Sequence, residues 1–119
     1  KMLQKQLTAV DYKRNMSIIG LLPTGKHKSI IAIGSYAQSE EKDDVAEVAF
    51  VVKEEFQGMG ICSFLLNILE NIAKENGYKA FVATVLGENR RMISIFQKRY
   101  PKAKIVEQYS GEIEITMEF

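Results

Sequence analysis

A glycine-rich stretch at residues 57–63, Gln-Gly-Met-Gly-Ile-Cys-Ser, could bind a phosphate group. It follows an apolar segment, residues 45–52, and precedes a segment of helical periodicity that begins at Gly60. Glycine lets the backbone turn sharply and approach a ligand, and the first N–H groups of a helix have no partner within the helix. Together with the helix dipole, these groups attract an anion. The candidate donors are the backbone amides of Gly58, Met59, Gly60, Ile61, Cys62 and Ser63.

Two known phosphate-binding patterns do not fit this loop. In the GxxxxGK[ST] pattern a lysine followed by serine or threonine comes after the glycines, and no such pair is present here. The GxGxxG pattern of dinucleotide-binding folds is incomplete, because Ser63 stands where its third glycine would be. Several nucleotide-binding folds share a glycine loop before a helix, so the loop alone does not identify the ligand.

The elements on either side must position this loop. Residues 45–52 are mostly apolar and β-branched and predict a strand, and residues 60–76 predict a helix that ends at Asn76 and Gly77. Apolar side chains recur in this helix at three- and four-residue spacing, and the polar ones are expected to face away from the core. The apolar set is Ile61, Phe64, Leu65, Ile68, Leu69, Ile72 and Ala73, and the polar set is Asn67, Glu70, Asn71 and Lys74.

The other segments predict one sheet with helices on it. Residues 3–15 favour a short helix with Thr8 as its N-cap, and residues 16–22 and 29–37 read as a hairpin around the turn residues 23–28. The acidic residues 39–44 form a solvated loop. A strand at 80–85, a helix from Glu88–Asn89 to about Tyr100 and strands at 103–107 and 112–119 complete the pattern. This order indicates an α+β fold.

Composition favours one cytoplasmic domain over residues 1–119. The chain is 46% hydrophobic and 26% charged, with a net charge of +1, so no overall charge points to a nucleic acid or membrane partner. It contains neither an apolar run long enough to cross a bilayer nor a signal peptide, and a single cysteine fits a reducing compartment. His27 lies in a turn between lysines with no metal-ligand spacing around it, so no metal is expected.

The loop resembles the signature of the GNAT superfamily of acyl-CoA-dependent N-acyltransferases, [QR]-x-x-G-x-[GA], here read from Gln57 to Cys62. The second half of the family pattern is also similar, with Asn89, Met92, Ile95 and Phe96 at its positions. Residues 7–12 and 46–52 look like the acetyltransferase modules fused to acyl-CoA synthetases and CoA-transferases, which include protein-lysine acetyltransferases. The resemblance covers nearly the whole chain and implies a central mixed, mostly antiparallel sheet flanked by helices.

The resemblance also implies roles for particular residues. Acetyl-CoA would be the co-substrate, with its pyrophosphate on the loop amides and Gln57 as the first residue of the signature. Main-chain groups of Phe50 and Val52 would pair with pantetheine and polarise the thioester carbonyl, because the strand separates from its neighbour in this family. Asn89 matches a position near the CoA arm, and it can equally be the N-cap of the last helix.

Glu47 is the candidate general base. It is the one carboxylate inside an otherwise apolar strand, and related lysine acetyltransferases have a glutamate ten residues before the signature. Burial would raise its pKa, and an amine must lose its proton before it attacks a thioester. The alternative is an exposed strand residue beside the acidic loop.

Departures from the family pattern leave a second function open. Phe96 stands where the family often has a tyrosine that protonates the leaving thiolate, and Tyr100 is expected to pack against the sheet. Cys62 replaces a glycine or alanine, either as a small packing residue or as a thiol activated by the helix N-terminus. The chain is therefore an N-acetyltransferase acting on a primary amine or protein lysine, or a non-catalytic acyl-CoA-binding regulatory module of a larger CoA-handling enzyme.

The family fold begins with a strand and a helix ahead of the segment that starts at Lys1. We therefore expect the first strand to be missing, and the chain to belong to a larger protein such as a CoA-transferase or acyl-CoA synthetase fusion. An unpaired sheet edge would favour a homodimer. Arg90, Arg91, Lys98 and Arg99 are interpreted mainly as a solvated face, with contact of Arg90 or Arg91 to CoA phosphate as the alternative.

Overall fold

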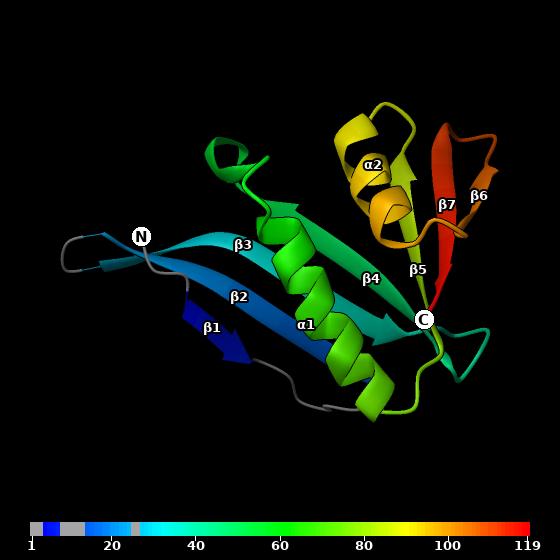
Figure 1. The fold of residues 1–119 in the computed structure, drawn as a ribbon, viewed down its shortest axis with the longest axis horizontal. Helices are drawn as coiled ribbons and strands as arrows, with labels where there is room; N and C mark the ends of the chain where they lie inside the picture. Colours follow the sequence, from blue (N-terminus) through cyan, green and yellow to red (C-terminus); the bar gives the residue numbers. More distant parts are fainter. Residues whose placement is uncertain (1–3, 8–13, 25–26) are drawn as a thin grey trace.

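Seven strands form one twisted sheet in a computed structural model that describes residues 4–7, 14–24 and 27–119 (Figure 1). Their order across the sheet is β1-β2-β3-β4-β5-β7-β6. The strands are β1 (Gln4–Leu7), β2 (Asn15–Thr24), β3 (His27–Gln38), β4 (Val45–Val52), β5 (Ala80–Leu86), β6 (Lys104–Glu107) and β7 (Glu112–Glu118). Only β4 and β5 run parallel, and the other neighbours are antiparallel. The predicted α+β class, with a mixed and mostly antiparallel sheet, is confirmed.

The hairpin of β2 and β3 is longer than predicted but has the predicted pairing. Its register runs from Asn15 opposite Ala37 to Thr24 opposite His27, with a bulge between Gly20 and Leu21. Because a bulge inserts an extra residue into one strand, it increases the local twist of the sheet. Part of the predicted turn, residues 25–26, lies outside the described residues.

The N-terminal segment corrects two predictions. Gln4–Leu7 is a strand rather than part of a helix, and it pairs antiparallel with Ile18–Leu21 of β2. The side chains of this segment are polar and compatible with a helix, which is why a helix was predicted. The segment forms a strand instead because the open edge of β2 supplies hydrogen bonds that outweigh local propensity. The edge expected to be unpaired therefore carries β1, and the dimer prediction loses the reason given for it. Thr8, the predicted N-cap, lies outside the described residues.

Two α-helices lie on the same face of the sheet (Figure 1). The first, α1 (Ile61–Glu75), crosses β2, β3 and β4, and the second, α2 (Arg90–Arg99), covers the side of β5 and β7. A short 3-10 helix, η1 (Glu54–Phe56), comes between β4 and the glycine loop. Both helices, β5 and the two closing strands agree with their predicted positions to within about two residues.

The buried stripe of α1 differs from the predicted one at two positions. Phe64 is 51% exposed, although it was assigned to the apolar face, and Glu70 is 8% exposed, although it was assigned to the polar face. The stripe is rotated because α1 packs against α2 as well as against the sheet. Glu70 faces Arg99 and Tyr100, which supply the partners that a buried carboxylate needs. The largest fully buried side chains are Phe81, Phe96, Ile18, Ile31, Leu65, Leu66, Leu69, Ile115 and Met117.

The face of the sheet opposite the helices is open within the described residues. Ile33 and Val51, paired neighbours on β3 and β4, are 38% and 68% exposed there. Of the described helices, none has the length and apolar composition that crossing a membrane requires.

Candidate active site

The glycine loop leads from β4 and η1 to the N-terminus of α1, and two of its glycines have the left-handed backbone conformation. Gly58 and Gly60 have φ values of 78° and 80°, which a residue with a Cβ atom rarely adopts. Gly60 is the N-cap of α1, and its carbonyl accepts a hydrogen bond from the amide of Phe64 at 3.0 Å. The amides of Ile61, Cys62 and Ser63 are therefore the unpaired first donors of the helix. They lie where the sequence predicted an anion site.

A cleft of about 960 Å³ opens between this loop, the end of β4 and the cleft side of α2. Nearly all of the predicted cofactor-binding residues line it: Phe50, Val52, Gln57, Gly58, Gly60, Ile61, Cys62, Ser63 and Asn89. Met59 does not line it and is 54% exposed. The cleft therefore brings together residues from three separate parts of the chain.

The parallel pairing of β4 with β5 stops after three residues, and this opens the sheet beside the cleft. The last pair is Glu47 with Val82, and beyond it the two strands diverge in Figure 1. On its other side β4 remains paired with β3 as far as Val52. The predicted separation of the strand from its neighbour is thus present.

Main-chain groups at the end of β4 face this opening. At either end of β4, Val45 O accepts from Ser39 N and Lys53 N donates to Ile31 O, both at 2.8 Å. Hydrogen bonding to an antiparallel neighbour alternates along a strand, so the odd-numbered residues of β4 bond to β3 and the even-numbered ones point toward β5. Phe50 therefore directs its main-chain groups into the gap, and Val52 directs its N–H there, while the Val52 carbonyl accepts a hydrogen bond from Gln57 Nε2.

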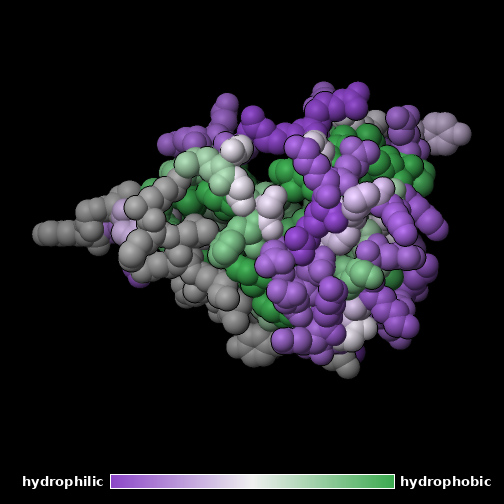
Figure 2. Space-filling view, viewed as in Figure 1, coloured by the Kyte–Doolittle hydropathy of each residue, from purple (hydrophilic) through white to green (hydrophobic). Residues whose placement is uncertain are grey.

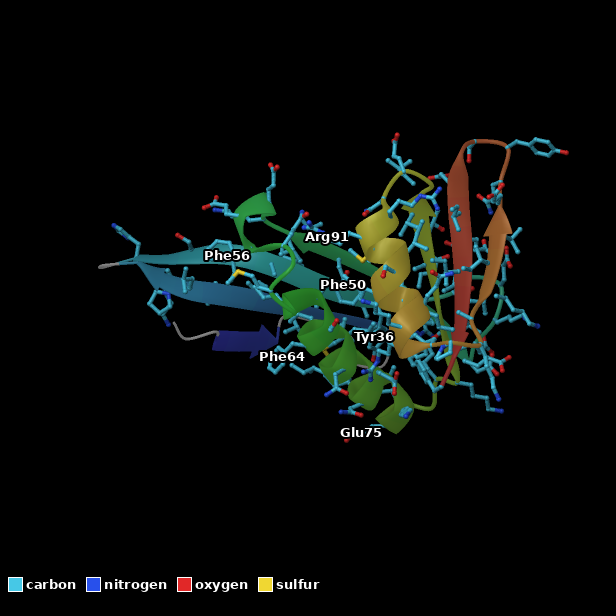
Figure 3. The ribbon with its side chains drawn as sticks, turned by 45° about the horizontal axis from the view of Figure 1, so that its top comes forward. Tyr36, Phe50, Phe56, Phe64, Glu75 and Arg91 are labelled. Atoms are coloured by element: carbon cyan, nitrogen blue, oxygen red, sulfur yellow. The ribbon has the colours of Figure 1, made fainter. Side chains whose placement is uncertain are left out.

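A chain of two hydrogen bonds ties the loop to both walls of the cleft. Gln57 Nε2 donates to Val52 O at 3.0 Å, and Arg91 Nη1 donates to Gln57 Oε1 at 3.1 Å. Figure 3 shows Arg91 between α2 and the loop, on the side of the cleft away from β5. This link could not be predicted from the sequence, because Arg91 is 34 positions from Gln57 and no spacing rule joins them.

Four cations line the cleft from α2: Arg90, Arg91, Lys98 and Arg99. Hydrophilic residues dominate the surface over this helix in Figure 2. No carboxylate of the described residues lines the cleft. The predicted solvated face is therefore also a wall of the cleft, and its charge favours an anionic ligand.

Asn89 acts as the N-cap of α2. Its side-chain oxygen accepts a hydrogen bond from the amide of Met92 at 3.2 Å, and the residue also lines the cleft. The capping interpretation is confirmed, and the cofactor contact stays a prediction.

Glu47 lies on the open face of the sheet, at the point where β4 and β5 separate. It is exposed, so its predicted burial is wrong, and the argument from burial for its basicity does not apply. Its neighbours Ala46 and Val48 point toward the helices and fill the core. Glu47 instead borders a hollow of about 390 Å³ with the polar side chains of Asn15, Ser17, Ser35 and Thr84.

Cys62 is a packing residue in this structure. Its side chain is buried, and its sulfur lies 3.7 Å from the sulfur of Met92. Burial raises the pKa of the thiol to about 11, so the thiol is protonated at neutral pH. The alternative of an activated thiolate is therefore wrong.

No phenol of the described residues lines the cleft. Phe96 is buried and packs against Phe50 with ring centroids 6.2 Å apart. Tyr100 is also buried, as predicted, and its hydroxyl donates to Glu70 away from the cleft. Burial and the neighbouring Glu70 carboxylate raise the pKa of Tyr100, which makes it a poor proton donor.

Among the described residues, no three His, Cys, Asp or Glu side chains come together in a way that could hold a metal ion. The groups available for chemistry are thus the amides at the N-terminus of α1, the main-chain N–H groups at the end of β4 and the cations of α2. The carboxylate of Glu47 lies on the far side of the gap between β4 and β5. A sheet opened beside a helix-terminal anion site is the kind of site that acyl-CoA-binding transferase domains present.

Comparison with known proteins identifies the family. The chain belongs to the GNAT family of acetyltransferases, whose family model matches residues 4–100. Acetyltransferase Pat of Mycolicibacterium smegmatis is 32% identical over 96 residues, which is 81% of this chain and 28% of that protein. Acetyltransferase PA5475 of Pseudomonas aeruginosa is 27% identical over 87 residues, 73% of this chain and 46% of that protein.

Solved structures show the same fold. The GNAT domain of PAT from S. lividans superposes with a TM-score of 0.77 at 26% identity, covering 94% of this chain and 65% of that one. A cAMP-binding acyltransferase from Mycobacterium smegmatis gives 0.76 at 28% identity, covering 92% and 32%. The chain thus spans less than half of the length of the curated relatives that it matches.

Proposed function

We propose that this domain is an acetyl-CoA-dependent N-acetyltransferase that transfers the acetyl group directly to a primary amine. The observation that carries the proposal is that β4–β5 pairing ends at Glu47 and Val82, which leaves the rest of β4 unpaired with β5 on the way to the glycine loop. An extended pantetheine arm can lie along the free edge of β4 while its pyrophosphate binds the amides of the loop. Residues 50–52 of β4 border the cofactor cleft, and the preceding residues 47–49 border the polar hollow. The cleft and the hollow are on opposite faces of the sheet.

In the proposed reaction, Glu47 takes a proton from the ammonium group of the acceptor. The amine nitrogen attacks the thioester carbonyl carbon and forms a C–N bond, and the carbonyl oxygen becomes negatively charged. Main-chain N–H groups of Phe50 and Val52 stabilise that charge, because they are fixed donors with no strand partner in β5. The carbonyl then re-forms as the C–S bond breaks, and CoA leaves as a thiolate, a fairly good leaving group that needs no phenolic acid. The second proton of the acceptor nitrogen is released to water or to the thiolate, which leaves a neutral amide.

The hollow around Glu47 suits a small cationic group. Its lining side chains Asn15, Ser17, Ser35 and Thr84 offer hydrogen bonds to an ammonium. One relative, 33% identical over 69 residues, is named β-lysine N6-acetyltransferase and so acts on an amine. We infer that the acceptor is a lysine-like primary amine, either a small molecule or a protein side chain.

The wider setting follows the relatives. Their greater length supports a domain that works within a larger protein, and fusion to a CoA-handling enzyme in the cytoplasm stays a prediction.

A second candidate function is a non-catalytic acyl-CoA-binding regulatory module. The burial of Phe96 and the engagement of Tyr100 by Glu70 favour it, because the described residues give the cleft no phenolic proton donor. Such a module would bind the same cofactor without turning it over.

Replacing Glu47 with Gln separates the two functions. For an enzyme we expect kcat for acetylation of a lysine peptide to fall by about 10²- to 10⁴-fold, the usual value of a general base. The dissociation constant for acetyl-CoA should not change, since Glu47 lies on the other face of the sheet. Glu55→Gln, an exposed carboxylate on η1, is the matched control and should keep full activity. Wild-type protein that binds acetyl-CoA but acetylates no amine would favour the regulatory module.

A further inference from the structure

Arg91 occupies a position that a structural role alone does not explain. It is the second residue of α2, where the positive end of the helix dipole makes a cation unfavourable. Its guanidinium points across the cleft toward another helix N-terminus, that of α1. Two positive helix ends and an arginine meet here, and a bound anion would offset their repulsion.

The guanidinium lies directly against the glycine loop. A Cβ atom added to Gly58 would be 3.9 Å from Arg91 Nη1, and the same nitrogen donates to Gln57 Oε1 at 3.1 Å. That hydrogen bond uses one of the five N–H donors of the side chain. Among the described residues no carboxylate forms an ion pair with Arg91, in contrast to Arg99, whose Nη2 is 3.3 Å from Glu70 Oε1. The guanidinium of Arg91 is thus held in place by Gln57, and no carboxylate of the described residues neutralises its charge.

We propose that Arg91 binds the pyrophosphate of the cofactor directly and sets the preference of the cleft for a phosphate-bearing thioester. The inference rests on the proposed function, because it takes acyl-CoA as the ligand of the cleft. The hydrogen bond to Gln57 holds the guanidinium beside the loop before the ligand arrives. The remaining N–H donors are then available to phosphate oxygens, with the planar geometry that suits arginine to this ligand.

Arg90 provides a matched comparison. It is the neighbouring residue with the same charge, it lines the same cleft, and its side chain makes no hydrogen bond to the described part of the loop. If only the net charge of the cleft mattered, neutralising either arginine would weaken binding equally. The proposal instead requires the effect to be specific to Arg91.

The test measures dissociation constants by calorimetry for CoA, 3′-dephospho-CoA and S-acetylpantetheine, which has neither the pyrophosphate nor the adenosine. We expect Arg91→Gln to weaken both CoA and 3′-dephospho-CoA by about tenfold, the factor for one charge-assisted hydrogen bond. Binding of S-acetylpantetheine should not change. Arg90→Gln removes the same charge from the cleft and should weaken CoA by less than Arg91→Gln does. Equal loss for all three ligands, or no loss for CoA, would overturn the proposal.

A double-mutant cycle with Gln57→Ala separates direct binding from support of the loop. If Arg91 touches the pyrophosphate, then Arg91→Gln still weakens CoA binding in the Gln57→Ala background. If Arg91 acts only by holding Gln57, it has no further effect there, and the proposal is wrong. Circular dichroism of each variant checks that the fold is kept. Wild-type protein that binds no CoA at all would instead remove the proposed function itself.

Discussion

At the scale of single residues, the pKa of the Cys62 thiol reports whether burial or the N-terminus of α1 controls its charge. It is next to the N-terminus of α1, a place that often lowers the pKa of a cysteine, yet burial raises its pKa to about 11. We therefore expect alkylation by iodoacetamide to be slow at pH 7 and to accelerate as the pH rises toward 11. Mass spectrometry at a series of pH values measures this rate.

The control for this titration is the unfolded chain, in which the thiol should titrate near its ordinary value of about 8.5. Cys62→Ala should keep the affinity for acetyl-CoA within about twofold, because the residue acts as a packing group. Fast alkylation of the folded protein at pH 7 would contradict the assignment and restore the activated thiolate.

Sequence patterns predicted the residues of the loop well and the partners of those residues poorly. Gly58, Gly60 and Asn89 are chosen by local backbone needs, a left-handed turn or a helix cap, and such needs are readable from neighbours in the chain. The link from Arg91 to Gln57 and the burial of Glu70 depend on how two distant helices pack, and no local pattern encodes them. For Glu47 the sequence predicted a strand residue, but the absence of a covering element on its face made the burial argument fail.

At the scale of elements, the start of α1 depends on Gly60. Its φ of 80° is unfavourable for other residues, and a Cβ atom there would touch nothing within 4 Å, so the cost of Gly60→Ala comes from the backbone alone. We expect a loss of about 1 kcal/mol in the free energy of unfolding. We also expect about tenfold weaker CoA binding, because a shifted turn misaligns the amides of the loop. Urea denaturation and calorimetry measure the two effects.

Gly77→Ala is the control for this substitution. Gly77 follows α1 with a φ of 90° and equally open surroundings, but it is at the other end of the helix from the cleft. It should lose a similar free energy of unfolding and keep its affinity for CoA. Equal losses of affinity in both variants would show that general destabilisation, rather than the loop, controls binding.

The junction of α1 and α2 is held by Glu70. Its carboxylate accepts hydrogen bonds from Tyr100 and from Arg99 Nε, the latter at 3.3 Å, and Lys74 Nζ lies 2.9 Å away. Burial raises the pKa of Glu70, but the hydrogen bonds from Tyr100 and Lys74 and the positive charges of Arg99 and Lys74 lower it by more. The net pKa in the folded state is below its ordinary value.

A lowered carboxyl pKa gives stability that is present above the ordinary value of 4.5 and is lost as the pH falls through the folded-state pKa. We therefore expect Glu70→Gln to cost about 2 kcal/mol of unfolding free energy at pH 7 and less at pH 3. Urea denaturation at several pH values measures this difference. Glu75→Gln, an exposed carboxylate on the same helix, should cost little at any pH. A cost for Glu70→Gln that is the same at pH 3 and pH 7 would contradict this account.

At the scale of the whole molecule, the two faces of the sheet have different proposed roles: one binds the cofactor and the other binds the amine. Both helices are on one face (Figure 1). The cleft lined by the glycine loop and the cations of α2 is on that side, and Glu47 with its polar hollow is on the other. The gap between β4 and β5 connects them. This layout lets a cofactor and an amine bind at the same time, which direct transfer without a covalent enzyme intermediate requires.

The overall sheet was largely predictable, because alternation, turns and helical periodicity identify most elements from Asn15 onward. The edge strand β1 was not predictable, since Gln4–Leu7 has no strand-like composition and pairs only because β2 offers a free edge. The early end of β4–β5 pairing was expected only from the family resemblance, because sequence patterns indicate strands but not the length of their pairing.

The measurement that tests the central claim most directly is a calorimetric titration of the folded protein with acetyl-CoA, followed by CoA. The claim is that the opened sheet and the glycine loop hold this cofactor. The account predicts one site per chain and a dissociation constant on the order of micromolar, with S-acetylpantetheine much weaker because the cations and loop amides bind phosphate. No detectable binding of acetyl-CoA at millimolar concentration would contradict it.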